Sequence, residues 1–169
     1  MNIEPNLTFL EILGLAIKSE VNAFQVYERL AQRVQNPALR DKLLFLKGEE
    51  EKHRTILEAM HAQNFPEVQL ELPPRSPLPR VEIALHEDTP VLELLDIALE
   101  WEKLSEEFYA DFARRAQDAK GKAILQYLSE MESGHYHLLK AERDLLAQFP
   151  EGYNAGEYHL GEEMLHLGP

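Results

Sequence analysis

Two short stretches, Glu50-Glu51-Lys52-His53 and Glu132-Ser133-Gly134-His135, share the pattern Glu-x-x-His. Residues three apart lie on one face of a helix, so in each stretch the glutamate and the histidine can aim at one point. One further glutamate precedes each stretch, Glu20 in the first half and Glu102 in the second. Equivalent positions in the two halves differ by 82 residues throughout. We therefore interpret the chain as a duplication in which four carboxylates and two imidazoles recur in register.

Four segments carry apolar residues at every third or fourth position, which predicts amphipathic α-helices. The predicted helices cover residues 8–35, 37–64, 90–117 and 119–149. Asn36-Pro37 and Thr89-Pro90 each offer a capping residue followed by proline, a signal for a helix start. Asp118 is the candidate cap of the fourth helix. The repeated Glu and His residues fall on the apolar stripes, near the middle of their helices.

The order of these segments predicts an all-α four-helix bundle in one domain, residues 1–169. Prolines exclude a helix from the connection between the second and third helices, and its length allows it to cross the whole bundle. The predicted parts are a hairpin at 8–64, a crossover linker at 65–89 with a short strand at 81–85, a second hairpin at 90–149 and a tail at 150–169.

The spacing within each hairpin predicts where the repeated residues meet. Glu20 and Glu50 are equidistant from the first turn, as Glu102 and Glu132 are from the second, so all converge at the middle of the bundle. Burying four unpaired carboxylates is unfavourable, and two divalent cations would compensate their charge. Oxygen-rich ligands with one imidazole per metal favour iron or manganese over zinc.

Composition narrows the class of protein further. The chain has a net charge of −13 and no cysteine, which argues against a nucleic-acid partner and excludes disulfides and iron–sulfur centres. No apolar run is long enough to span a membrane, and no secretory signal precedes the first helix. We therefore expect a cytoplasmic protein.

On these residues the sequence resembles the ferritin-like superfamily and, within it, the rubrerythrin-like proteins. The resemblance covers residues 8–149. It rests on Glu20, Glu50-x-x-His53, Glu102, Glu132-x-x-His135, Ala16, Ala98, Tyr27 and Tyr109.

The resemblance implies a non-haem di-iron oxidoreductase that reduces hydrogen peroxide or dioxygen, with manganese as the alternative metal. It implies that Glu50 and Glu132 bridge two ions and that Glu20 and Glu102 are terminal ligands. His53 and His135 would each bind one ion. Two other functions stay open: a ferroxidase or iron-storage protein, and a structural metal bundle without turnover.

Three differences from the patterns of related proteins matter. Rubrerythrins usually carry a rubredoxin domain with cysteine pairs, so a chain without cysteine requires a separate electron-donor protein. Bacterioferritins place a haem-binding methionine where this chain has Glu51, so we expect no haem. Many relatives carry an extra ligand glutamate at the position of Ser105. Glu106, one residue further on, has Phe24 as its counterpart, and three roles stay open for it: an extra ligand, a proton relay, or a rim glutamate that reaches water.

Several other residues are weaker candidates. Tyr27 and Tyr109, on the same stripes as Glu20 and Glu102, are predicted to hydrogen-bond ligand carboxylates, to act in redox chemistry or to fill the core. Trp101 faces off its stripe and is a candidate for a contact between subunits. We expect a homodimer, and exchange of a hairpin between chains stays open. Two further groups lack matched partners. The tail motif Glu163-x-x-His166 is a weak metal candidate, and His61, His86, His137 and His159 are assigned to the surface.

Overall fold

A computed structural model describes residues 7–74, 89–116 and 119–150 of the chain. They form four α-helices, with bounds α1 (Phe9–Arg33), α2 (Pro37–Asn64), α3 (Val91–Arg115) and α4 (Ala119–Gln148). The bounds of α3 follow those of α1 by 82 residues at both ends, so the duplication extends to the helix ends. The predicted all-α four-helix bundle is confirmed. The predicted strand at 81–85 lies outside the described residues.

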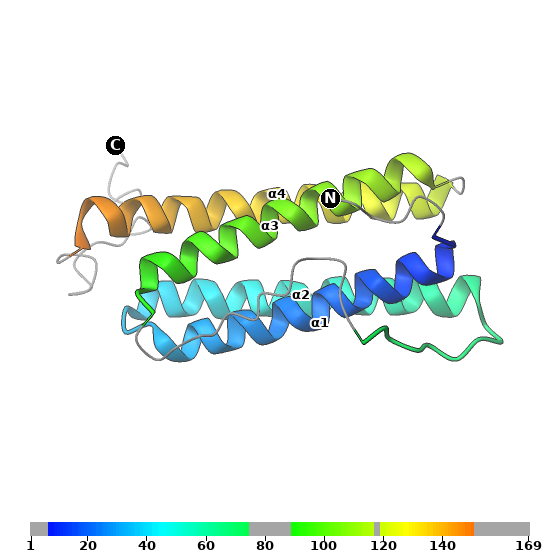
Figure 1. Ribbon diagram of the computed structural model, residues 1–169, viewed down its shortest axis with the longest axis horizontal. Coiled ribbons are helices and arrows are strands. Elements are labelled where there is room, and N and C mark those ends of the chain that lie inside the picture. Colours follow the sequence, from blue (N-terminus) through cyan, green and yellow to red (C-terminus); the bar gives the residue numbers. More distant parts are fainter. Residues whose placement is uncertain (1–6, 75–88, 117–118, 151–169) are drawn as a thin grey trace, which may run out of the picture.

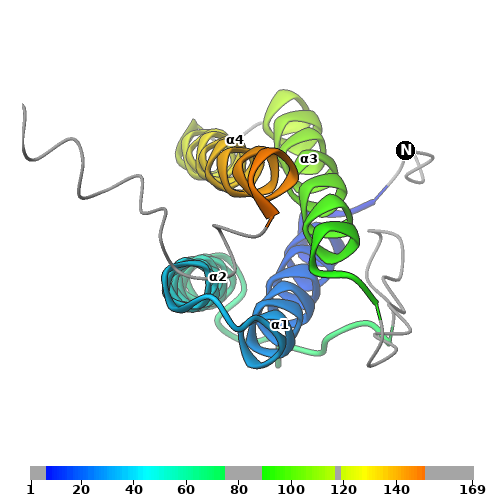
Figure 2. The same ribbon diagram turned by 90° about the vertical axis from the view of Figure 1, so that its left-hand side faces the viewer.

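The helices are arranged as two antiparallel hairpins, α1 with α2 and α3 with α4 (Figure 1). Seen end-on, α1 lies beside α3 and α2 lies beside α4 (Figure 2). α2 ends and α3 begins at opposite ends of the bundle (Figure 1). The connection between them therefore spans the length of the bundle, as its predicted length allows.

Side-chain caps start the two helices of the first hairpin. Thr8 and Glu11 form a capping box, in which the Glu11 amide donates to Thr8 Oγ1 at 3.3 Å and the Thr8 amide donates to Glu11 Oε2 at 2.8 Å. Asn36 Oδ1 accepts from the Leu39 amide at 3.0 Å, and Pro37 occupies the first helical position. The predicted Asn36-Pro37 start is therefore confirmed.

The predicted Thr89 cap of α3 is wrong. Pro90 is the N-cap residue, with φ −58° and ψ 143°, and α3 starts at Val91 without a side-chain cap. Because Pro90 is still extended, Thr89 lies one residue too early to cap the helix. The Thr89 carbonyl instead accepts from Arg33 Nη2 at 2.9 Å, which ties the start of α3 to the end of α1. The Asp118 cap lies outside the described residues.

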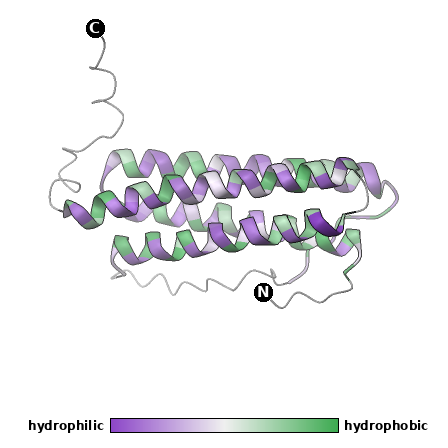
Figure 3. Cartoon of the chain, turned by 90° about the horizontal axis from the view of Figure 1, so that it is seen from above, coloured by the Kyte–Doolittle hydropathy of each residue, from purple (hydrophilic) through white to green (hydrophobic). Residues whose placement is uncertain are grey.

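Two apolar clusters fill the bundle, one on each side of its centre, and hydrophilic and hydrophobic residues alternate along each helix (Figure 3). One cluster contains Leu13, Ile17, Leu57, Phe108, Phe112, Leu125 and Leu128, and the other contains Leu30, Leu39, Leu43, Leu46, Leu94, Leu95 and Leu139. Each cluster combines the open end of one hairpin with the turn end of the other, because the two hairpins run antiparallel. No helix among the described residues combines the length and hydropathy needed to cross a membrane.

Candidate metal centre

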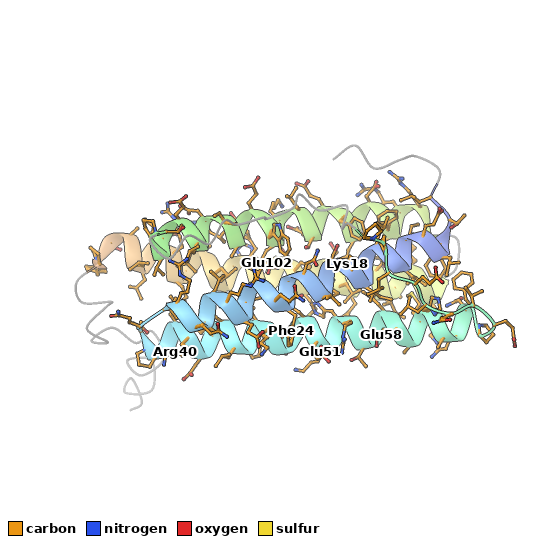
Figure 4. All side chains as sticks on the ribbon, turned by 60° about the horizontal axis from the view of Figure 1, so that its bottom comes forward. Lys18, Phe24, Arg40, Glu51, Glu58 and Glu102 are labelled. Carbon is orange, nitrogen blue, oxygen red and sulfur yellow. The ribbon has the colours of Figure 1, made fainter. Side chains whose placement is uncertain are left out.

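The polar residues predicted to meet do meet, between the two apolar clusters. All six side chains are buried, with residue exposures between 1% and 4%, and they come from all four helices. They are Glu20 on α1, Glu50 and His53 on α2, Glu102 on α3, and Glu132 and His135 on α4. Figure 4 shows Glu102 at mid-length of the bundle. One chain therefore supplies every side chain of the cluster.

The first half of the cluster surrounds His53. Its Nδ1 atom lies 3.0 Å from Glu132 Oε1, 3.4 Å from Glu20 Oε2 and 3.6 Å from Glu50 Oε2. One ligand atom from each of these four side chains lies within 4.8 Å of the others. This spacing allows four ligand atoms to surround one cation.

The second half of the cluster repeats this arrangement around His135. Its Nδ1 atom lies 3.3 Å from Glu50 Oε1 and 3.5 Å from both Glu102 Oε2 and Glu132 Oε2. The imidazole rings of His53 and His135 are nearly parallel, with centroids 5.4 Å apart. Glu50 and Glu132 belong to both halves, each offering one carboxylate oxygen to each. The geometry is that of two adjacent cation positions with two shared carboxylates.

Unpartnered polar atoms test whether metal ions fit these residues. One oxygen from each of the four carboxylates, and both ring nitrogens of each histidine, are buried without a hydrogen-bond partner in the described residues. The Nδ1 atoms lie close to the carboxylates, but they are not aligned with them as hydrogen-bond donors. Buried polar groups are normally paired. Two divalent cations would satisfy the facing oxygens and the Nδ1 atoms and would balance four negative charges, so the donor set fits a dinuclear site.

The electrostatics of the metal-free cluster lead to the same conclusion. Burial raises the pKa of Glu20 and Glu102 well above the usual range, and the neighbouring carboxylates raise it further. Burial lowers the pKa of His135, but the carboxylates around it outweigh this effect and raise the pKa to about 12. The pKa of His53 is raised for the same reason. Burial opposes ionisation of Glu132 as well, but contacts with both histidines hold its pKa below the usual range. The metal-free cluster therefore retains protons that bound cations would displace.

Two tyrosines hold the carboxylates that are not shared. The Tyr27 hydroxyl donates to Glu102 Oε1, and the Tyr109 hydroxyl donates to Glu20 Oε1. In both glutamates Oε2 remains unpartnered and faces the neighbouring histidine. Each tyrosine thereby orients one carboxylate so that a single oxygen points into the cluster.

Glu106, a candidate extra ligand or proton relay, is not brought into the cluster. Its carboxylate is 26% exposed and pairs with Lys103 Nζ at 2.8 Å. Glu106 lies four residues after Glu102, and the helix turns this position toward solvent. Ser105, three residues after Glu102, is buried instead. Phe24, the counterpart of Glu106, packs under Lys47, whose Nζ lies 4.5 Å from the ring centroid.

The surface assignments were correct for His137 and wrong for His61. His61 is 5% exposed, and the ring of Phe65, directly after α2, packs beside it. A signal was present, since His61 lies eight residues after His53 and so falls on the same face of α2. Trp101 was expected to face away from the core and is also buried by its own chain. His86, His159 and the Glu163-x-x-His166 motif lie outside the described residues.

Four helices around two adjacent groups of carboxylates and histidines that could hold metal ions define this protein as a ferritin-like bundle. More particularly, the chain belongs to the rubrerythrin family, whose model (Rubrerythrin) matches residues 11–143. The predicted membership is confirmed.

Two solved structures resemble the whole bundle. A hypothetical protein from Pyrococcus furiosus is 30% identical, with a TM-score of 0.72, over 85% of this chain and 92% of that chain. Bacterioferritin from Rhodobacter capsulatus, described with a metal-free dinuclear site and a haem iron, is 21% identical. Its TM-score is 0.65, and the match covers 90% of this chain and 94% of that chain. No curated protein matches the chain.

Proposed function

We propose that this protein is a non-haem di-iron oxidoreductase that reduces hydrogen peroxide or dioxygen, with manganese as the alternative metal. The observation that carries the proposal is the pair of four-residue sets that share Glu50 and Glu132. Shared carboxylates would hold two cations close enough to act on one small oxidant together. When bound, two ferrous ions would supply the two electrons that convert one hydrogen peroxide and two protons into two water molecules.

The chain's own residues prepare this chemistry. Glu50 and Glu132 would bridge the ions, while Glu20 and Glu102 would each bind one ion through the oxygen that the tyrosines leave free. His53 and His135 would each bind one ion through Nδ1.

The walls of the site favour a small oxidant over a larger substrate. Four leucines with no exposed surface close the core on both sides of the cluster, namely Leu46, Leu57, Leu128 and Leu139. They exclude bulk water and leave no room among them for a large molecule.

We propose three further properties. The electrons come from a separate electron-donor protein, because a chain without cysteine cannot build its own rubredoxin-type centre. The protein acts in the cytoplasm. It is a homodimer, and the assembly of the whole cluster from one chain favours a dimer without exchanged hairpins.

Metal analysis with single-turnover kinetics tests the proposal. Purified protein should hold about two iron or manganese ions per chain. The ferrous form should be oxidised stoichiometrically by one hydrogen peroxide per site, without further uptake of iron. Stable metal binding without reaction would favour a structural bundle. Accumulation of many iron ions per chain in a large particle would favour iron storage.

A further inference from the structure

The two hairpins are alike at the candidate metal centre, so the centre itself does not determine which hairpin pairs with which. Each hairpin supplies two glutamates and one histidine to the cluster. Each also supplies one tyrosine that bonds a glutamate of the other hairpin. Two first hairpins, from two copies of the chain, could therefore bring together the same four carboxylates and two imidazoles.

One buried contact between the hairpins is not duplicated. Lys42 Nζ on α2 pairs with Glu142 Oε1 on α4, and these two helices lie side by side (Figure 2). The side chain of Glu142 is only 4% exposed, and that of Lys42 is 35% exposed. The positions equivalent to Lys42 and Glu142 carry Ile124 and Met60, which both belong to the apolar packing at the other end of the bundle. The contact between α2 and α4 is therefore ionic on one side of the centre and apolar on the other.

This asymmetry penalises a bundle made of two like hairpins. Two first hairpins would place each Lys42 opposite the Met60 of the other copy. Two second hairpins would place each Glu142 opposite Ile124. A charge held against apolar side chains in a core is unfavourable, whereas an ion pair and an apolar pair are each acceptable there. Only a first hairpin combined with a second hairpin forms one pair of each kind.

We propose that Lys42 and Glu142 form the recognition pair by which the first hairpin selects the second hairpin and rejects a second copy of itself. The apolar pair at the other end shows that the interface can be filled without charges, so the ion pair contributes selectivity rather than packing. Glu142 lies seven residues after His135, roughly 10 Å along α4. The selection therefore acts away from the cluster and does not depend on bound metal.

Thermal unfolding of the full chain, with chelator, tests the first part of the proposal. Lys42→Ile and Glu142→Met each copy the residue at the equivalent position of the other hairpin. Each should lower the midpoint by roughly 5–10 °C, because one charge then faces an apolar side chain. The double variant copies the apolar pair and should unfold at or above the wild-type midpoint. Single variants as stable as wild type, or a double variant no more stable than Lys42→Ile, would overturn the proposal.

Refolding the two single variants together tests the choice of partner. Exchange of hairpins between the two chains would restore the pair of Lys42 with Glu142 in one bundle. In the other bundle it would place the two apolar replacements opposite each other. Both mismatches are removed only by this exchange, so we expect the mixture to form an exchanged dimer with a midpoint above that of either variant alone.

Cross-linking detects this dimer, because the chain has no cysteine of its own. Lys120 Nζ on α4 donates to Gln63 Oε1 on α2 at 2.5 Å at the exposed edge of the interface. Gln63→Cys is placed in one variant and Lys120→Cys in the other, and a short bismaleimide joins them only where hairpins of different chains pair. We expect several-fold more cross-linked dimer than from wild-type chains with the same two cysteines. Equal yields in the mixture and in the wild-type control would overturn the assignment of the recognition pair.

Discussion

The hydroxyl of Tyr27 on α1 hydrogen-bonds Glu102 on α3, which belongs to the other hairpin. Tyr109 on α3 reaches back to Glu20 on α1 in the same way. Each tyrosine follows the glutamate of its own helix by seven residues, so these crossed bonds require α1 and α3 to run antiparallel. The two hairpins thus orient each other's unshared carboxylates, and the pair of bonds ties the bundle together at the candidate metal centre.

Tyr27→Phe and Tyr109→Phe should each weaken metal binding. Loss of the hydroxyl leaves Oε1 of the paired glutamate buried and free to rotate, and loss of such a partner typically costs about 10–100-fold in metal affinity. Competition with a coloured chelator measures the effect. Tyr127→Phe is the control, since Tyr127 is exposed on α4. Unchanged affinity in both core variants would show that the hydrogen bonds do not position the carboxylates.

Glu50→Ala and Glu132→Ala should each abolish the paired site, because each removes a carboxylate that belongs to both halves. Metal content after gel filtration should fall below two ions per chain. Glu51→Ala is the matched control on α2, because Glu51 is turned outward and pairs with Arg54. Two tightly held ions in both core variants would contradict the assignment of Glu50 and Glu132 as ligands shared by both halves of the cluster.

Glu106→Gln should have little effect on reoxidation by peroxide, because its carboxylate pairs with Lys103 outside the cluster. We expect two bound ions and a single-turnover rate within about twofold of wild type, since an exposed ion pair contributes little. A several-fold slower reoxidation, with metal content unchanged, would indicate that Glu106 acts as a proton relay, as its position on the apolar stripe suggested.

The metal-free protein should lose stability as the pH rises. Folding raises the pKa of Glu20, Glu102, His53 and His135, so the folded state binds more protons than the unfolded state. The contribution of the glutamates falls as pH rises above their unfolded pKa of about 4.5, and that of the histidines falls above about 6.5.

Thermal unfolding with chelator should therefore give a lower midpoint at pH 8 than at pH 6. Metal should raise the midpoint most at pH 8, because cations replace the lost protons. Gln at positions 20 and 102 should flatten the pH dependence of the metal-free form. A midpoint that rises between pH 6 and pH 8 would contradict the prediction that folding raises the pKa of these glutamates and histidines.

Gly48→Ala and Gly134→Ala should each stabilise the protein. Both glycines lie within helices that carry the cluster, both are exposed, and neither has a neighbouring atom within 4 Å of an added Cβ. Replacing glycine by alanine in an exposed helix interior contributes about 1 kcal/mol, or an increase of about 2–4 °C in the unfolding midpoint. Calorimetry measures this shift. A lower midpoint in either variant would indicate that another molecule approaches the backbone there.

The sequence alone determined the helices, the duplication and the level at which the six polar residues meet. Periodicity shows which face of a helix is apolar, and equal distance from a turn places two residues at one height of a hairpin. These are local properties, so Glu20, Glu50, His53, Glu102, Glu132 and His135 could be assigned without coordinates.

Only the tertiary structure decided what each face touches. Periodicity does not tell which neighbouring helix covers a side chain, so it could not show that Tyr27 bonds the glutamate of the opposite hairpin. It also placed Glu106 on the apolar stripe, whereas the packing of α3 turns that residue to the rim and buries Ser105. His61 packs beside Phe65 at the start of a segment without helical periodicity, and that segment passes close to Gly14 on α1. Long-range packing, rather than local pattern, set these three outcomes.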